Sequence, residues 1–153
     1  MSVELVVNHV GLTVKDLDRS TEFYAAFGGE VMVGAHFEGT HMDHGLGVPG
    51  VDLHVRMIRF GNVVLELLQY DSPPSAPFTS RNCDVGASHL AFGVDDIHAL
   101  KAELTAKGVE FFSDPVAIDD GPLTGGFWVY AKDPDGVSVE FLQSGPEPAD
   151  TNR

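Results

Sequence analysis

Alternating blocks of apolar and polar residues divide the chain into short predicted strands and two predicted helices. Strands are expected where β-branched and other apolar residues gather between turn-forming residues. By this criterion strands are predicted at residues 6–14, 30–33, 53–60, 62–70, 88–94, 109–113, 127–132 and 137–143. The last two are joined by Asp133-Pro134-Asp135-Gly136, a sequence typical of a hairpin turn.

A helix is predicted after the first strand in each half of the chain. Asp16 and Asp96 stand where each helix would begin, and a carboxylate there can accept hydrogen bonds from the free N–H groups of the first turn. The helices are expected to run to residues 27 and 107, because a glycine follows each of these positions. The order strand, helix and three strands therefore occurs twice.

An internal repeat supports this duplication. The segment HVGLTVKDLDRSTEFYAAFGGEVM, from His9, aligns without a gap with HLAFGVDDIHALKAELTAKGVEFF, from His89, at an offset of 80 residues. Further on, VVLELLQ aligns with VSVEFLQ at an offset of 74 residues, which pairs Glu66 with Glu140. Two matches in the same order indicate two copies of one module. We predict an α+β fold with tandem βαβββ modules at residues 1–70 and 87–143, forming a cupped mixed sheet.

Three segments fall outside the repeated pattern. Residues 34–50 are rich in glycine and histidine and predict a long loop of the kind that tends to be functional, because such loops are uncommon in compact domains. Residues 71–86 contain three prolines and predict a linker, and residues 144–153 lack an apolar face and predict a disordered tail.

Composition and charge narrow the range of partners. The chain has 23 acidic and 9 basic residues, a formal net charge of −14 and no basic cluster, which argues against nucleic acids and anionic membranes. It contains no apolar run of about 20 residues and no recognisable signal peptide, so we expect a cytoplasmic protein. Its one cysteine, Cys83, cannot form an internal disulfide and is expected to have no catalytic role.

Glu66 is the first candidate for chemistry, because it interrupts the apolar run VVLELLQ. A charge in such a strand needs solvent, a partner or a metal ion. The repeat places a histidine in the first strand and a glutamate in the last strand of each module. If these strands are neighbours, His9, Glu66, His89 and Glu140 could converge on one open site. Two imidazoles and two carboxylates suit Zn²⁺, Ni²⁺, Co²⁺, Mn²⁺ or Fe²⁺.

The quoted segments, together with DPDGVSVEFLQ, resemble the vicinal oxygen chelate superfamily over residues 5–143. This superfamily includes glyoxalase I, methylmalonyl-CoA epimerase, fosfomycin-modifying enzymes, extradiol dioxygenases and bleomycin-binding proteins. The resemblance implies paired βαβββ modules that hold a divalent metal, often in a homodimer. It implies the same four metal ligands: His9, Glu66, His89 and Glu140.

The resemblance to individual branches is uneven. Glyoxalase I has this ligand pattern, but its usual glutathione-binding arginine and asparagine are replaced by Thr13 and Tyr70, so a glutathione conjugate is not expected. Acyl-CoA epimerases generally carry glutamine at the position of Glu66. Extradiol dioxygenases bind Fe²⁺ through residues corresponding to His9, His89 and Glu140, with a tyrosine at the position of Tyr130, yet Glu66 would occupy a coordination position that oxygen needs.

We therefore expect a metal-dependent lyase or isomerase, of the glyoxalase or epimerase kind, that transfers a proton next to a metal-bound carbonyl or vicinal oxygens of a small molecule. Glu66 or Glu140 would act as the base, and Tyr130 is a further candidate catalytic residue. The alternatives are an Fe²⁺ ring-cleaving dioxygenase and a metal-free drug-binding protein.

The remaining histidines and three arginines have no clear role in the sequence. His36, His41 and His44 are expected to be solvated, unless one reaches the site as an acid or base. The sequence does not indicate toward which face of its strand His54 points, and His98 is expected on the outer part of a helix. An anionic substrate could be held by one of three arginines: Arg56, Arg59 and Arg81.

Overall fold

The computed structural model describes residues 5–146 and divides the chain into two compact units, Met1–Pro77 and Phe78–Arg153. The boundary falls within the segment 71–86 that was predicted as a linker. Of the predicted tail, residues 147–153 lie outside the described part of the chain. Among residues 5–146, no helix is both long and apolar enough to cross a membrane.

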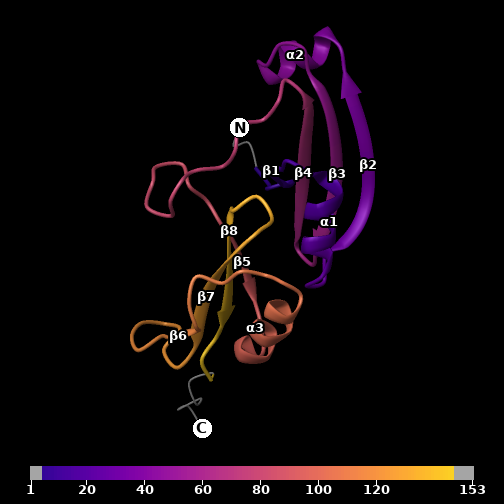
Figure 1. The fold of residues 1–153 in the computed structure, drawn as a ribbon. Coiled ribbons are helices and arrows are strands. Elements are labelled where there is room, and N and C mark those ends of the chain that lie inside the picture. Colours follow the sequence, from indigo (N-terminus) through magenta and orange to yellow (C-terminus); the bar gives the residue numbers. More distant parts are fainter. Residues whose placement is uncertain (1–4, 147–153) are drawn as a thin grey trace. The chain divides into compact units, whose positions relative to one another are not determined.

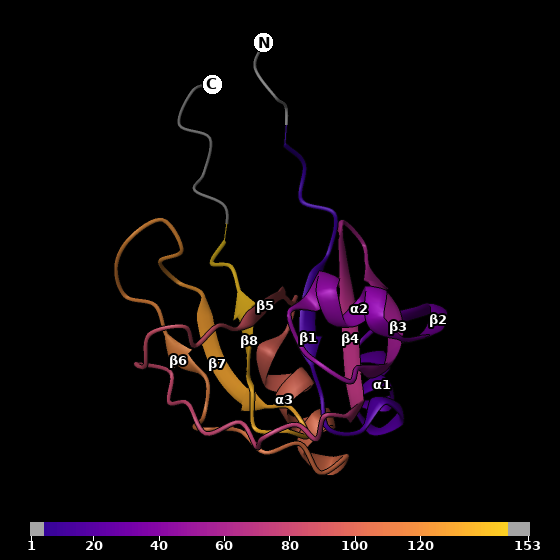
Figure 2. The same ribbon diagram turned by 90° about the horizontal axis from the view of Figure 1, so that it is seen from above.

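The first unit is a four-stranded mixed sheet in the order β1-β4-β3-β2. Its elements are β1 (Val10–Thr13), α1 (Leu17–Ala25), β2 (Glu30–Glu38), α2 (Thr40–Leu46), β3 (Asp52–Phe60) and β4 (Val63–Ser72). Strand β1 is parallel to β4, and the other neighbours are antiparallel. Helix α1 lies against this sheet, and α2 lies at the end where β2 leads into β3 (Figure 1). Strand β2 forms an outer edge (Figure 2).

The second unit repeats this arrangement in the order β5-β8-β7-β6. Its elements are β5 (Leu90–Gly93), α3 (Ile97–Ala106), β6 (Val116–Ala117), β7 (Phe127–Lys132) and β8 (Ser138–Gln143). Strand β5 is parallel to β8, just as β1 is parallel to β4. The two four-stranded mixed sheets confirm the predicted α+β fold with two βαβββ modules.

The same repeat positions form the core of each module. Leu67 of β4 and Phe141 of β8, which the sequence alignment pairs, are both 0% exposed. Tyr24 of α1 and its counterpart Leu104 of α3 are also buried. Burial of these side chains attaches each helix to its sheet, because apolar area removed from water stabilises the folded state. The duplication therefore extends from the backbone to the packing.

The segment 34–50, predicted as a loop, is largely regular. Strand β2 continues to Glu38, where the sequence predicted a strand ending at residue 33, and helix α2 follows. The backbone of β2 pairs with β3 throughout this extension, so tertiary pairing overrides the low strand propensity of its glycine and alanine. Gly39, with φ of 97°, permits the turn from β2 into α2.

The strand predicted at residues 109–113 is also wrong. Here the structure has one isolated bridge, between Phe111 and Ala131, and the edge strand β6 forms later, at Val116–Ala117. The sequence could not locate this strand because a two-residue edge strand has no alternating pattern to detect.

Candidate functional site

In the first module, Glu66 lies in β4 and points to the face opposite the buried core. Its strand neighbours Leu65 and Leu67 are both 0% exposed, and side chains alternate between the faces of a strand. Glu66 pairs in register with Gly11 of β1 and with Met57 of β3. Because side chains alternate along the strand, β4 can bury Leu65 and Leu67 on one face and present Glu66 on the other.

His9 immediately precedes β1 and meets Glu66 across the parallel pair of strands. Its Nε2 lies 3.2 Å from Glu66 Oε2, and its Nδ1 lies 2.8 Å from Asn8 Oδ1. An imidazole nitrogen and a carboxylate oxygen are both ligand types for divalent metals when the imidazole nitrogen carries no proton. The pair can therefore supply two donors to a cation.

The second module repeats this pair at the equivalent positions. His89 Nε2 lies 3.1 Å from Glu140 Oε2, and β5 is parallel to β8 with Ala91 opposite Glu140. The side chains of Glu66 and Glu140 are 19% and 18% exposed, so both carboxylates are mostly shielded but still accessible. The structure thus brings together His9 with Glu66 and His89 with Glu140, each pair within its own module.

Both pairs fit a divalent metal by donor type and spacing. In a tetrahedral site with bonds of 2.0–2.2 Å to nitrogen and oxygen, neighbouring donor atoms lie about 3.4 Å apart. The nitrogen–oxygen distances of 3.2 Å and 3.1 Å are close to this value. Imidazole together with carboxylate suits Zn²⁺ and the other first-row divalent ions. Each pair could therefore act as a two-donor half of a metal site.

Tyr130 and Met57 occupy equivalent places beside the two glutamates. Tyr130 pairs in register with Glu140, and its hydroxyl lies 3.3 Å from His89 Nε2. Burial, followed by the charge of Glu140 and a hydrogen bond with it, raises the pKa of Tyr130. The hydroxyl therefore stays protonated at neutral pH and can donate a hydrogen bond.

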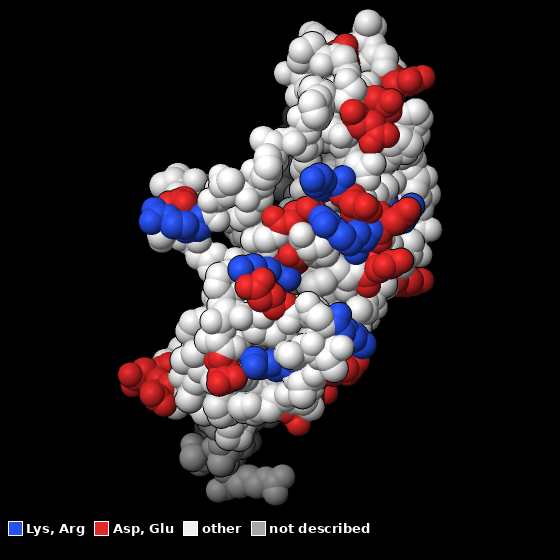
Figure 3. Space-filling view, in the orientation of Figure 1, with Lys and Arg blue, Asp and Glu red and all other residues white. Residues whose placement is uncertain are grey.

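On the face shown in Figure 3, several basic side chains lie beside acidic ones. Among the candidates for holding an anion, Arg56 donates to Asp18 at 2.7 Å and Arg81 to Asp84 at 2.7 Å. Further ion pairs are Lys101–Asp114, Lys107–Glu103 and Lys132–Glu110. Such pairing lowers the local positive potential that an anionic partner would need.

Histidines that the sequence left unassigned lie on the first sheet. His36, expected in a loop, belongs to β2 and lies beside His54 of β3. A hydrogen bond with Asp52, at 2.6 Å, raises the pKa of His36. In the sequence, the spacing Asp52-x-His54 was only a weak indication that these side chains would meet His36, because the strand that contains His36 was not predicted.

Two glutamines also have a role that sequence analysis missed. Gln69 Oε1 accepts a hydrogen bond of 2.7 Å from the backbone N–H of Leu17, and Gln143 Oε1 accepts one of 2.9 Å from Ile97. Asp16 and Asp96 cap the same helices as predicted. The matching Gln residues in the repeat were the available signal, and they tie the glutamate-bearing strand to the start of the helix in each module.

Comparisons with known proteins agree with this architecture. The sequence model of the Glyoxalase/Bleomycin resistance protein/Dioxygenase superfamily matches residues 6–141. A 2-epi-5-epi-valiolone epimerase from Actinomyces sp. is 35% identical over 90% of this chain and 79% of its own length. Human mitochondrial methylmalonyl-CoA epimerase is 29% identical over 90% of this chain and 73% of its own length. These relatives are isomerases, in agreement with the enzyme class that the sequence predicted.

The fold is also found in a solved structure. A glyoxalase family protein from Bacillus cereus superposes with a TM-score of 0.84, at 20% identity, over 95% of this chain and 97% of that one. The match to the family over nearly the whole length, together with the duplicated βαβββ module, leads to one conclusion. This chain belongs to the glyoxalase/bleomycin resistance protein/dioxygenase superfamily, also called the vicinal oxygen chelate superfamily.

Proposed function

We propose that this protein is a divalent-metal-dependent epimerase, in which the two His–Glu pairs together hold one metal ion. The observation that carries the proposal is the His9–Glu66 pair, in which an imidazole nitrogen and a carboxylate oxygen lie 3.2 Å apart, a spacing that suits two ligands of one metal ion. One pair offers only two donors, fewer than the three or four protein ligands that metal sites normally have. Joint action of His9, Glu66, His89 and Glu140 supplies four. The ion is one of Zn²⁺, Ni²⁺, Co²⁺, Mn²⁺ and Fe²⁺.

The chain's own residues perform the proton transfer. When bound, the metal supplies a Lewis acid that stabilises negative charge on a substrate oxygen. Glu66 removes a proton from the carbon next to the carbonyl, and a proton from solvent is returned to the opposite face of that carbon, which inverts its configuration. Glu66 is assigned this role because its register partner, the apolar Met57, offers no hydrogen bond that would hold the carboxylate. Glu140 remains a ligand, because the hydroxyl of its register partner Tyr130 forms a hydrogen bond that orients the carboxylate. The Tyr130 hydroxyl donates a hydrogen bond to the substrate or to Glu140.

The favoured substrate class is a polyhydroxylated ketone without phosphate groups. The relative that is 35% identical is named for such a compound, 2-epi-5-epi-valiolone. Coenzyme A thioesters carry several phosphate charges, which a chain of net charge −14 would repel. The ion pairs of Arg56 and Arg81 with aspartates further reduce the positive charge that is available to bind phosphate groups.

Deuterium exchange in D₂O tests this proposal. The metal-loaded protein is incubated with 2-epi-5-epi-valiolone or with methylmalonyl-CoA, and deuterium at the carbon next to the carbonyl is measured by mass spectrometry. We expect exchange and epimerisation with the ketone, and loss of both after treatment with a chelator. Exchange that is unaffected by metal removal would overturn the metal-dependent mechanism, and exchange with the thioester alone would overturn the substrate class.

We also propose that the enzyme acts as a homodimer, as the family resemblance implies. Analytical ultracentrifugation of the full chain tests the dimer. Mixing Glu66→Gln chains with Glu140→Gln chains then tests whether one site takes ligands from both chains. Recovery of activity on mixing indicates a shared site, and no recovery indicates that each chain supplies its own four ligands.

Ring cleavage is the second candidate function, favoured by Tyr130 beside His89 and Glu140. Bound Fe²⁺ and oxygen uptake with catechol would support it over epimerisation. Glu66 counts against it, because a fourth protein ligand removes a coordination position. A drug-binding protein would instead bind its ligand without metal, and the two His–Glu pairs count against that function.

A further inference from the structure

A separate group of histidine and aspartate side chains lies on the first module's sheet, on the face opposite Glu66. His54 pairs in register with Gln69, whose side chain reaches the backbone of α1. His54 therefore lies on the helix-facing side of the sheet. Glu66 is three residues before Gln69 in β4, and side-chain alternation places it on the other side. The two sets of ligands cannot serve the same ion.

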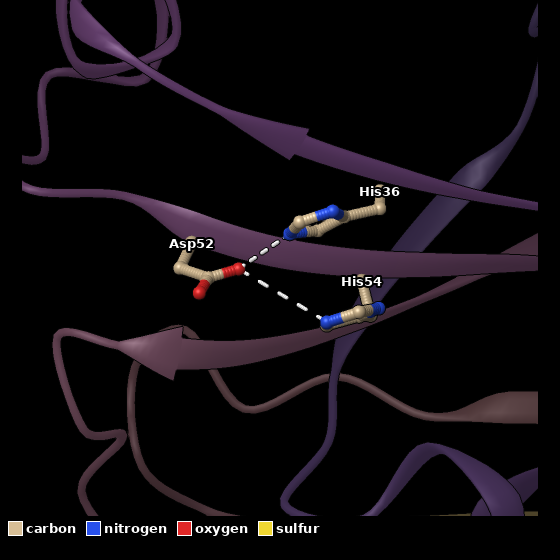
Figure 4. Close-up of side chains that lie close together, drawn as sticks. All are labelled: His36, Asp52 and His54. Carbon is tan, nitrogen blue, oxygen red and sulfur yellow. Dashed lines mark hydrogen bonds and ion pairs between the residues drawn. The ribbon is translucent and has the colours of Figure 1, made fainter.

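Two histidines and an aspartate converge in this group, as Figure 4 shows. His36 Nε2 lies 2.6 Å from Asp52 Oδ1, and His54 Nε2 lies 4.0 Å from the same oxygen. One donor atom from each of the three residues lies within 4.8 Å of the others. The imidazole rings of His36 and His54 stack, with centroids 4.3 Å apart and planes inclined by 11°.

Asp71 lies beside His54 and offers a fourth donor. Its Oδ2 lies 3.3 Å from His54 Nε2, and its Oδ1 accepts a hydrogen bond of 2.7 Å from Gln69 Nε2. Outer hydrogen bonds of this kind orient metal-binding carboxylates. Gln69 is itself fixed by the start of α1, so Asp71 is held by a side chain that cannot move freely.

We propose that His36, Asp52, His54 and Asp71 form a second metal site, selective for Zn²⁺-like ions. Two imidazole nitrogens and two carboxylate oxygens suit Zn²⁺ and neighbouring first-row ions better than Mg²⁺ or Ca²⁺, which prefer oxygen alone. The donor atoms of His36, Asp52 and His54 lie within 4.8 Å of one another and need only small side-chain shifts to reach the spacing of about 3.4 Å in a tetrahedral site, and rotation of Asp71 beside His54 would complete it.

The site would join three strands of one sheet. His36 comes from β2, Asp52 and His54 from β3, and Asp71 from β4. Strand β2 is an edge strand whose residues are all exposed, so it depends on pairing with β3 for its position. A metal at this place would fasten the edge strand and the neighbouring helix α2, which begins two residues after β2 ends. The role of the site is therefore structural.

Zinc binding by the full chain tests this inference. Chelator-treated protein is titrated with Zn²⁺, passed over a desalting column and analysed for metal. We expect one fewer bound ion per chain in H36N/H54N than in the wild type. The matched control is H41N/H44N, which removes two histidines of α2 and should bind as many ions as the wild type. Equal binding by H36N/H54N and the wild type would overturn the site.

The Glu66→Gln/Glu140→Gln double variant separates this inference from the proposed function. That variant should keep the second site, and Zn²⁺ should still raise its Tm. Adding Asp52→Asn, which keeps the size of the side chain, should weaken Zn²⁺ binding at least tenfold and abolish the Tm shift. If Zn²⁺ shifts the Tm equally with and without Asp52, the second site is refuted, whatever happens at the His–Glu pairs.

Discussion

The two modules share the same strand arrangement around a His–Glu pair but differ in the residues next to that pair. In both, a parallel strand pair sets a histidine beside a glutamate at 3.1–3.2 Å. Opposite that glutamate the first module has the apolar Met57, and the second has the hydrogen-bonding Tyr130. Duplication thus supplies the His–Glu pair twice, and the neighbour across the strand distinguishes the two carboxylates. The proposed mechanism uses this difference when it gives proton transfer to Glu66 and metal retention to Glu140.

The modules also differ at their edges. Strand β2 has nine residues, whereas its counterpart β6 has two. The longer edge strand contributes His36, and the second module has no equivalent extension. An added edge strand is a place where new ligands can be acquired without disturbing the repeated His–Glu pair.

The largest expected effect is on activity, and substitution of the two glutamates should affect metal content differently. Glu66→Gln should lower epimerisation by about 10²–10⁴-fold, the range for loss of a general base, while most of the bound metal remains. Glu140→Gln should lower both activity and metal content. Turnover with 2-epi-5-epi-valiolone and metal analysis of the same samples measure the two effects. Unchanged metal content and turnover in both variants would refute the proposed site.

Core truncation tests whether the modules depend equally on their matched buried residues. Leu67→Ala should lower the free energy of unfolding by about 2–5 kcal/mol, and Phe141→Ala by about 3–5 kcal/mol, because each leaves a cavity beneath its helix. Denaturant unfolding followed by circular dichroism measures both. A loss below about 1 kcal/mol in either variant would contradict the burial of that position.

Removing either interior glutamine should have a smaller effect on stability. Gln69→Ala and Gln143→Ala each delete a hydrogen bond to the first turn of a helix, which we expect to cost about 0.5–2 kcal/mol in the free energy of unfolding. Glutamate at either position is the matched control, since its carboxylate also accepts and is favoured near a helix N-terminus. Equal destabilisation by alanine and glutamate would show that packing, rather than the hydrogen bond, matters.

The smallest effect concerns alkaline pH and the second module. The pKa of Tyr130 is raised in the folded state, so its contribution to stability is complete below the unfolded pKa of about 10. That contribution is lost as pH rises through the higher folded pKa. Tyr130→Phe should therefore lose less stability than the wild type when the pH is raised above 10. Met57→Leu, at the matching place in the first module, should show the wild-type dependence in the same unfolding measurements.

The sequence predicted most of the fold because the repeat carried two independent signals. His9 and His89 marked the first strands, and Glu66 and Glu140 marked the last ones. The same repeat correctly indicated which histidine meets which glutamate within a module. It could not reveal the helix contacts of Gln69 and Gln143, since hydrogen bonds across 52 and 46 residues depend on the folded register.

Elements without a counterpart in the other module were predicted poorly. His36 was expected in a loop because the glycines around it suggested a turn, yet pairing with β3 draws the segment into a strand. The Asp52, His54 and Asp71 group depends on that pairing and on a shift of register between Asp52 and Leu53. Neither feature leaves a periodic pattern in the sequence.

The hydrogen bonds from Gln69 and Gln143 have a consequence for how the chain is connected. Each joins the last strand of a module to the start of its helix, so each module is closed as a noncovalent ring. A ring of this kind keeps its internal contacts when the connecting segment between modules is lengthened or rerouted. The natural places for inserted sequence and for new chain ends therefore lie in the exposed segment 73–80, outside both rings.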